Sequence, residues 1–137
     1  MPFGNYDRRY YDPENLRLVS ILLKGAELRT GDFESGILGA EGNSFIYFDP
    51  PYYKLGGYSD FNRYTANQFR AIDHLRLAAL CNELTDRGIR WAMSNSATPF
   101  IRDLYKQYRL VSIKARREIN LNSNSRDVEE LLILNYD

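Results

Sequence analysis

The stretch that decides the fold is Ser44-Phe45-Ile46-Tyr47-Phe48-Asp49-Pro50-Pro51-Tyr52. Its aromatic and β-branched residues, up to Phe48, are typical of a buried strand. The two prolines end the strand, because each lacks a backbone N–H and has a fixed φ. The sequence therefore predicts a rigid turn that holds a carboxylate, a carbonyl and an aromatic ring at the end of a strand.

This turn suits a flat heterocycle that carries an exocyclic amine. The amine would donate its two hydrogens to Asp49 and to the Pro50 carbonyl, Pro51 would stiffen the turn, and the ring would stack on Tyr52. Such an amine is a poor nucleophile, and two acceptors would stabilise the positive charge that develops when it attacks. Transfer of a group to such an amine would then depend on positioning, without a metal or a covalent intermediate. The competing interpretation is that the prolines merely end a strand.

The rest of the sequence predicts alternating helices and strands. Asp12 and Pro13 begin a helix that Gly25 ends, and the capping box from Thr65 to Gln68 begins one that ends at Gly88. A short helix begins at Pro99, and strands are expected over residues 26–29, 44–48, 90–94, 109–119 and 128–136. The pattern indicates an α/β sheet, in which ligands bind at the carboxyl ends of parallel strands. Residues 49–52 and 94–96 both follow such strands.

The composition fits one cytoplasmic domain. The chain has 137 residues, of which 44% are hydrophobic, and its 18 basic residues balance 18 acidic ones, so net charge gives no hint of a partner. The single cysteine, Cys81, is expected in the core. We expect no signal peptide, no membrane span and no metal site. His74 is expected on the surface of its helix, because charged residues surround it.

Several segments resemble the Dam type of DNA adenine methyltransferases, the D12 class. The resemblance covers nearly the whole chain. The segments that carry it are Pro2-Phe-Gly-Asn-Tyr6, Phe45-Ile-Tyr-Phe-Asp-Pro-Pro-Tyr-Tyr53, Phe61-Asn-Arg-Tyr64 with Phe69, Ser94-Asn-Ser96, Lys114-Ala-Arg-Arg117, Asn122-Ser-Asn-Ser-Arg126 and Glu129-Glu-Leu-Leu-Ile-Leu-Asn-Tyr136.

The resemblance implies a fold, a reaction and a cofactor. The fold would be α/β: part of a Rossmann-like S-adenosylmethionine-dependent methyltransferase sheet, with helices on both faces and a closing antiparallel strand pair. Residues 1–11 would be the remnant of a DNA-recognition hairpin and 12–137 the catalytic domain. The reaction would methylate N6 of adenine in double-stranded DNA, with catalytic residues Asp49, Pro50, Pro51 and Tyr52. Asp32 and Phe33, together with Asp49, would contact the cofactor.

The resemblance also suggests where DNA binds. Pro2 and Tyr6 match DNA-contacting positions of the hairpin, and Asn5 stands where a basic residue is usual. Arg116 and Arg117 are candidates for phosphate contacts, which contribute affinity rather than specificity. The competing interpretation of these two arginines is a solvated strand face.

The family's Phe-x-Gly-x-Gly cofactor loop does not occur in the sequence. In the resembled fold the first two strands lie between residues 26–29 and residues 44–48, so the aromatic strand would expose its edge, and an exposed edge invites pairing with another chain. We expect one of three situations. The sequence is a fragment of a longer methyltransferase, one half of a split enzyme, or a truncated remnant that pairs with itself.

Three functional hypotheses remain open. The first is adenine methylation, in a restriction–modification, phage or replication-marking setting. The second is methylation of another planar amine, such as cytosine N4 or a protein glutamine; the aspartate that opens the motif favours adenine. The third is a non-catalytic DNA-binding or interaction module, which the missing glycine loop favours.

Overall fold

The computed structural model describes residues 11–53, 69–116 and 127–137. These residues form two compact units, the first ending at Asp32 and the second spanning Phe33–Asp137. None of the helices in the described ranges is long and apolar enough to cross a membrane.

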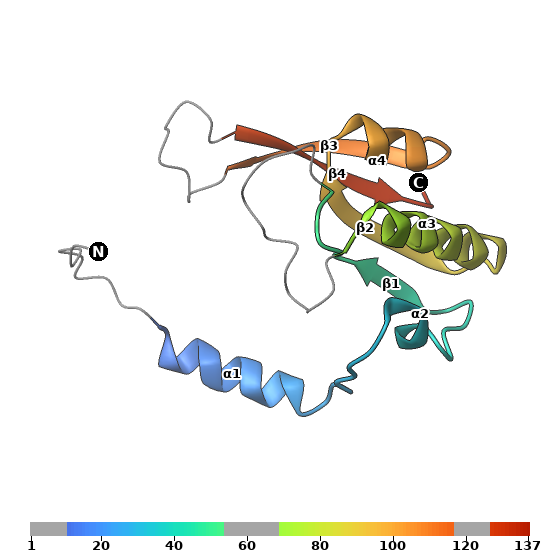
Figure 1. The fold of residues 1–137 in the computed structure, drawn as a ribbon. Helices are drawn as coiled ribbons and strands as arrows, with labels where there is room; N and C mark the ends of the chain where they lie inside the picture. Colours follow the sequence, from blue (N-terminus) through green and yellow to red (C-terminus); the bar gives the residue numbers. More distant parts are fainter. Residues whose placement is uncertain (1–10, 54–68, 117–126) are drawn as a thin grey trace. The chain divides into compact units, whose positions relative to one another are not determined.

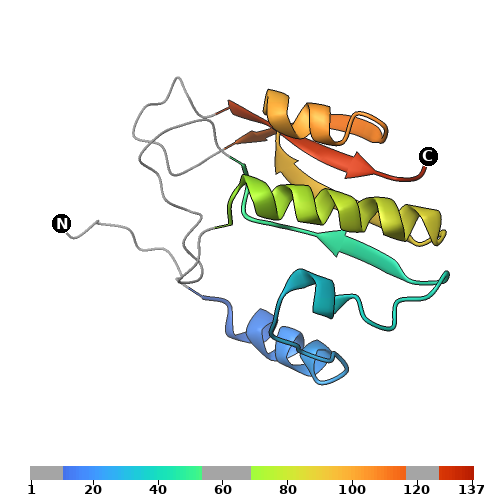
Figure 2. The same ribbon diagram turned by 45° about the vertical axis from the view of Figure 1, so that its right-hand side comes forward.

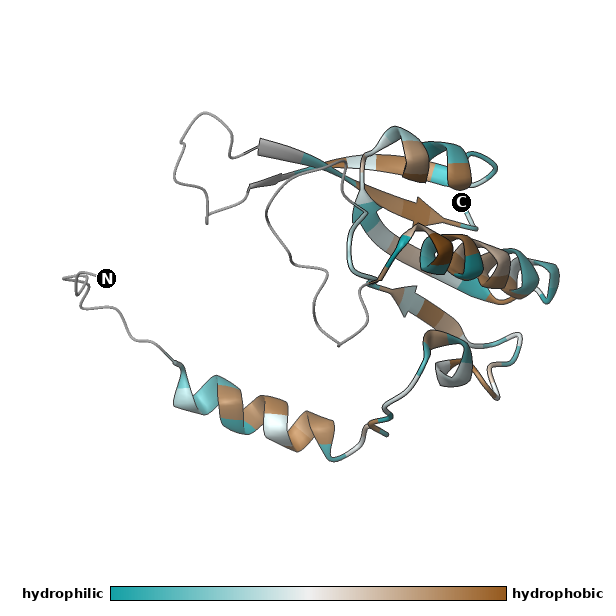
Figure 3. Cartoon of the chain, in the orientation of Figure 1, coloured by the Kyte–Doolittle hydropathy of each residue, from teal (hydrophilic) through white to brown (hydrophobic). Residues whose placement is uncertain are grey.

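The first unit is built around helix α1 (Pro13–Leu23), which begins as predicted. The Asp12 carboxylate accepts hydrogen bonds from the backbone N–H groups of Glu14 and Asn15, at 3.0 and 3.1 Å. These contacts satisfy donors that the first turn of a helix leaves open. The apolar side chains of α1 are exposed, among them Leu22 at 75%, and they colour much of this helix brown in Figure 3.

The strand predicted over residues 26–29 is wrong. The structure has no strand there, and the Glu27 and Arg29 side chains instead pair with each other in solvent. A strand needs a neighbouring strand for its backbone hydrogen bonds, and the described part of the chain supplies none at this position. The turn predicted at residues 31–33 runs directly into a short helix, α2 (Phe33–Gly36), where the second unit begins.

The second unit is a four-stranded sheet with helices packed on it (Figure 1). Its strands are β1 (Phe45–Phe48), β2 (Arg90–Ser96), β3 (Arg109–Arg116) and β4 (Asp127–Leu134), and its longer helices are α3 (Ala71–Asp86) and α4 (Pro99–Leu104). The order is β1-β2-β4-β3, with β1 and β2 parallel and β4 antiparallel to both of its neighbours. The predicted α/β class and the closing antiparallel pair are therefore confirmed.

Helices α3 and α4 cover the same face of the sheet, as Figures 1 and 2 show. Leu77 and Leu84 of α3 form one core with Ile101 of α4, with Tyr105 directly after α4 and with the inward residues of the strands. The thiol of Cys81 is buried in this core, as predicted. On the opposite face of β1, Phe45 and Tyr47 are 58% and 56% exposed.

The prediction of helices on both faces stays a prediction. The structure describes α1 within its own unit, so it does not say which face, if any, that helix covers.

Trp91 of β2 joins the sheet to the end of α3. Its indole Nε1 donates to the Thr85 hydroxyl at 2.9 Å and to the Cys81 carbonyl at 3.1 Å. Its backbone N–H donates to the Asn135 side-chain oxygen at 2.8 Å, and the Asn135 amide donates back to the Ile89 carbonyl at 2.9 Å. The chain can reverse between α3 and β2 because Gly88 has a φ of 73°. The Asn135 side chain thus links the residue after β4 to the start of β2 and to Ile89 before it.

We predict that Asn135→Ala lowers the free energy of unfolding by about 2 kcal/mol, because it leaves the buried Trp91 N–H and the Ile89 carbonyl without their partner. Urea denaturation followed by Trp91 fluorescence measures the effect. Asn15→Ala, on the exposed side of α1, is the control and is expected to change stability by less than about 0.5 kcal/mol. Equal effects of the two substitutions would contradict this account.

Candidate active site

The site forms where the carboxyl ends of β1 and β2 lie side by side. In the parallel register Phe48 pairs with Met93, so the residues that follow, Asp49 and Ser94, come next to each other. The Ser94 hydroxyl donates a hydrogen bond of 2.7 Å to Asp49 Oδ1. Asp49 itself is exposed, so its carboxylate is accessible to a ligand. The predicted Asp49–Tyr52 turn is therefore at a strand end, as the sequence indicated.

Tyr52 reaches from this turn toward the neighbouring strand β4. Its phenol donates a hydrogen bond of 3.4 Å to Glu130 Oε2. Partial burial raises the pKa of Tyr52, and the negative charges of Glu130 and Asp49 raise it further, while a hydrogen bond with Ser94 acts in the opposite direction. The Tyr52 phenol therefore stays neutral at physiological pH and lies among acceptors and acids.

Tyr53 is fastened to β2 through its backbone. Its N–H donates to the Asn95 side-chain oxygen at 3.2 Å, and its carbonyl accepts from the Ser96 hydroxyl at 2.5 Å. Asn95 is fully buried, and its oxygen also accepts from the Ser96 N–H at 2.9 Å. Both polar groups of the Tyr53 backbone are thus satisfied by neighbouring residues of one strand, which restrains the turn that precedes it.

His74 is buried and not on the surface, so that prediction is wrong. It is 1% exposed, and its ring lies edge-on to Tyr53 at 5.5 Å and to Phe69 at 4.8 Å. Phe100 completes this aromatic cluster by packing on Tyr53 at 4.3 Å. The charged neighbours of His74 in sequence misled the prediction, because on a helix successive residues point in different directions. Burial lowers the pKa of His74 to about 4, with a smaller opposing effect of Asp73.

We predict that His74 makes the fold sensitive to acid. Its pKa falls from 6.5 to about 4 on folding, so the unfolded chain binds the proton more readily and stability is lost as pH falls from about 6.5 to about 4. The loss is on the order of 3 kcal/mol. Urea denaturation between pH 7 and pH 4 measures it. In His74→Phe the pH dependence should be shallower over this interval, and an equal slope in both proteins would contradict the assignment.

The predicted cofactor residues Asp32 and Phe33 are consecutive in the chain and belong to different units. Asp32 is the last residue of the first unit and Phe33 the first of the second. The Phe33 ring meets Phe69 edge-on at 6.1 Å, and the Arg76 guanidinium lies 4.9 Å from its centroid. The Phe33 ring is therefore held in place at the start of α2. Its two partners, Phe69 and Arg76, are not part of the Asp49–Tyr52 turn.

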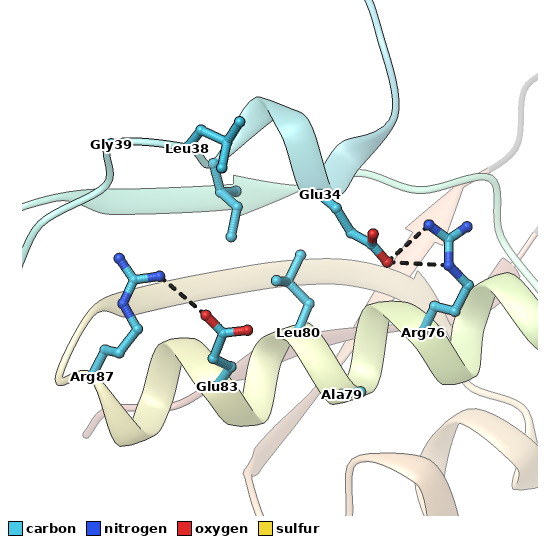
Figure 4. A pocket seen from close by; sticks show the side chains of 9 residues that line it. Glu34, Leu38, Gly39, Arg76, Ala79, Leu80, Glu83 and Arg87 are labelled. Atoms are coloured by element: carbon cyan, nitrogen blue, oxygen red, sulfur yellow. Dashed lines mark hydrogen bonds and ion pairs between the residues drawn. The ribbon is translucent and has the colours of Figure 1, made fainter.

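A hollow of about 480 Å³ lies between α2 and α3 (Figure 4). Four charged residues in its wall form two ion pairs: Glu34 with Arg76 at 2.8 Å, and Glu83 with Arg87 at 3.3 Å. None of residues 49–52 lines it. Because its charges already satisfy one another, this hollow is a poorer candidate for the reacting site than the strand ends.

The predicted DNA-contacting residues are mostly outside the described ranges. The residues that lie outside the described ranges are Pro2, Asn5, Tyr6 and Arg117. Arg116 is the last residue of β3, where its backbone is paired with Asp127 of β4. In the parts of the chain that the structure describes, no three His, Cys, Asp or Glu residues are grouped as a metal site would require.

Sequence reasoning missed Glu130 and assigned no role to Ser94, Asn95 and Ser96, although these three follow a predicted strand end. The pairing of β2 with β4, which places Ser96 opposite Glu130, is what brings Glu130 to the site. The available signal was the alternation of side chains along a strand, which puts Ser94 and Ser96 on one face and Asn95, which is buried, on the other.

The fold and site define an α/β domain with a polar cluster at the carboxyl ends of two parallel strands, the place where such sheets bind ligands. Residues 1–119 match the profile of the D12 class N6 adenine-specific DNA methyltransferases. The chain belongs to this family.

Curated relatives agree with the assignment. The type II methyltransferase M.MjaIII of Methanocaldococcus jannaschii is 38% identical over 140 residues, which are 99% of this chain and 48% of the relative. The type II methyltransferase M1.LlaDCHI of Lactococcus lactis subsp. cremoris is 33% identical, over 99% of this chain and 49% of the relative. The DNA adenine methylase of Escherichia coli K12 is 30% identical, over 98% and 49%. The chain thus spans about half the length of the relatives that it matches.

Proposed function

We propose that this chain carries the base-binding part of an enzyme that transfers a methyl group from S-adenosylmethionine to N6 of adenine in double-stranded DNA. One observation carries the proposal: the accessible Asp49 carboxylate and the Tyr52 ring are at a parallel strand end, on a turn held by Ser94, Asn95 and Ser96. Family membership and relatives named as DNA adenine methylases support adenine as the target.

Asp49 and Pro50 would bind the target amine. Ser94 engages Oδ1 of Asp49, and a carboxylate has acceptor capacity on both oxygens, so Oδ2 is available for one amine hydrogen. The Pro50 carbonyl would accept the other, with Pro51 keeping the turn rigid. Two acceptors stabilise the positive charge that forms on the nitrogen as it attacks. The amine proton would leave to solvent after the new N–C bond has formed.

Tyr52 would stack on the adenine once the base has left the duplex. Enzymes that modify a base inside duplex DNA turn it out of the stack and hold it against aromatic side chains. The bond from the Tyr52 phenol to Glu130 restrains the direction of this ring before a base arrives. Glu130 is thus a residue that would orient the stacking surface.

When bound, S-adenosylmethionine supplies a methyl group activated by its positive sulfonium. The carboxylate of Asp49 suits a cation nearby, and the ring of Phe33, already braced by Phe69 and Arg76, suits an adenine. Asp32, the residue before Phe33, would also contact S-adenosylmethionine. The glycine-rich cofactor loop would come from the part of the relatives that this chain does not match. Arg116 and Arg117 would contact DNA phosphates, and Pro2, Asn5 and Tyr6 would contribute from the remnant of the recognition hairpin.

We predict that Asp49→Ala lowers methyl transfer by more than about a hundredfold, because it removes an acceptor that acts in the transition state. Transfer of labelled methyl groups to adenine-site and cytosine-site duplexes is the measurement. It is made with the chain alone and with the chain supplemented by the unmatched half of the M. jannaschii relative. DNA affinity should stay within about twofold of the original.

Asp103→Ala on α4 is the matched control, because Asp103 is an exposed carboxylate paired only weakly with Lys106 in solvent. Methylation of cytosine duplexes instead of adenine duplexes would overturn the substrate. DNA binding without methylation, in either preparation, would favour the second candidate, a non-catalytic DNA-binding module. The observation that favours this candidate is the missing glycine-rich loop.

The partner that the site requires would join the sheet at β1. This strand is at one end of the order β1-β2-β4-β3, so one side of its backbone has no partner strand among the described residues. Beside that edge, Phe45 and Tyr47 expose more than half of their surface. A free edge flanked by exposed aromatic rings favours the addition of a strand. The proposed occupant is the half of the relatives that this chain does not cover, within the same polypeptide or in a second one.

We predict that Tyr47→Lys weakens association with that half by at least about tenfold, because it removes apolar surface from the contact and introduces a charge. Analytical ultracentrifugation of the mixture, and of the chain alone, measures the association. Ile72→Lys, at a 60% exposed position on α3, is the control and should leave association unchanged. If Tyr47→Lys leaves the association unchanged, the β1 edge is not the binding surface. If the chain alone forms a homodimer that Tyr47→Lys dissociates, the occupant of the β1 edge is a second copy of this chain.

A further inference from the structure

Three consecutive residues at the end of β2 all make hydrogen bonds to the Asp49–Tyr53 turn. Ser94 contacts the Asp49 side chain, Asn95 the Tyr53 N–H and Ser96 the Tyr53 carbonyl. The first bond holds the beginning of the turn and the other two hold its end. The prolines restrict the backbone between these points, so the turn is fixed at both ends and stiff in the middle.

The three residues do not have equivalent tasks. Asn95 and Ser96 bind backbone groups, so their bonds secure the position of the turn whatever side chains it carries. Ser94 binds a side chain instead, and that side chain is the carboxylate proposed to accept the target amine. A carboxylate on an exposed turn can rotate about its side-chain bonds, and a bond to one oxygen restricts this rotation.

The geometry around Ser94 connects it with two functional groups. A hydroxyl has one donor and two acceptor positions, and Ser94 donates to Asp49 Oδ1 at 2.7 Å. The Ser94 hydroxyl also opposes the rise in the pKa of the Tyr52 phenol. Ser94 thus binds the proposed amine acceptor directly.

We propose that Ser94 is a positioning residue for methyl transfer, which binds Asp49 Oδ1 and thereby directs Oδ2 toward the target amine. This inference rests on the proposed function, in which Asp49 receives that amine. Ser94 makes no contact with the reacting atoms in this account and acts through Asp49. Its effect should therefore fall on the rate of transfer and not on the affinity for DNA or for S-adenosylmethionine.

The test compares Ser94→Ala, Ser94→Thr and Ser112→Ala in the preparation that shows activity. Ser94→Thr keeps a hydroxyl and suits a strand. Ser112 is the matched control, because it is a serine of the same sheet whose hydroxyl accepts from Arg102 at 3.3 Å, in the edge strand β3 away from β1. Single-turnover methyl transfer is measured at saturating DNA and cofactor, and both dissociation constants are measured separately.

The expected result is an about tenfold slower transfer in Ser94→Ala, equivalent to the loss of one hydrogen bond to a charged group. Both dissociation constants should stay within about twofold, Ser94→Thr should keep more than about half of the rate and Ser112→Ala should match the original protein. A rate in Ser94→Ala within twofold of the original, or a loss that appears as weaker DNA binding, would overturn the role.

A second readout separates this inference from the proposed function. The NMR chemical shift of the Asp49 carboxyl carbon should change in Ser94→Ala and stay unchanged in Ser112→Ala, whether or not the protein is active. An unchanged shift overturns the positioning role on its own. An inactive original protein with the expected shift change would refute the methylation proposal, while the bond between Ser94 and Asp49 would stand.

Discussion

The parallel pairing of β1 with β2 is the constraint on which the site depends. Parallel strands bring their carboxyl ends to one edge of a sheet, and here the register Phe48–Met93 places two polar segments beside each other. A shift of one residue would turn Asn95 out of the core and move the serines to the other face. Asn95 is fully buried while Ser94 and Ser96 are partly accessible, so burial of one residue sets the orientation of the other two.

The packing behind β2 protects this register. Trp91 is buried, and its indole donates hydrogen bonds to Thr85 and Cys81 of α3. The Asn135 side chain, directly after β4, accepts a hydrogen bond from the Trp91 backbone N–H. These contacts are made three residues before Ser94 and leave β2 little freedom to slide. The Asp49 carboxylate therefore accepts its hydrogen bond from a strand, β2, whose position is held by the contacts of Trp91 and Asn135.

Apolar surface is distributed unevenly between the described parts. One face of the sheet is closed by α3 and α4, whereas Phe45 and Tyr47 at the β1 edge, and the apolar residues of α1, remain exposed. Burial of such surface is the main favourable contribution to folding, and the association proposed at β1 would bury Phe45 and Tyr47. The match to about half the length of each relative indicates how much polypeptide those relatives have in addition.

The sequence by itself determined the local features. Asp12 and Pro13 begin α1, the two prolines end β1, and Gly88 allows the chain to reverse after α3. Each of these results depends on backbone geometry or on hydrogen bonds between near neighbours, which a short stretch of sequence contains. The Asp49 turn and its place at a strand end were predictable for the same reason.

Only the tertiary structure decided the features that depend on distant residues. Residues 26–29, predicted as a strand, have no partner strand among the described residues and stay irregular. His74 is buried because Tyr53, Phe69 and Phe100 surround it, and three separate segments supply those rings. The bonds from Ser94, Asn95 and Ser96 to the Asp49 turn, and the bond from Tyr52 to Glu130, join residues up to 78 positions apart. Such contacts follow from strand order and register, which the burial of the whole core selects and no local pattern encodes.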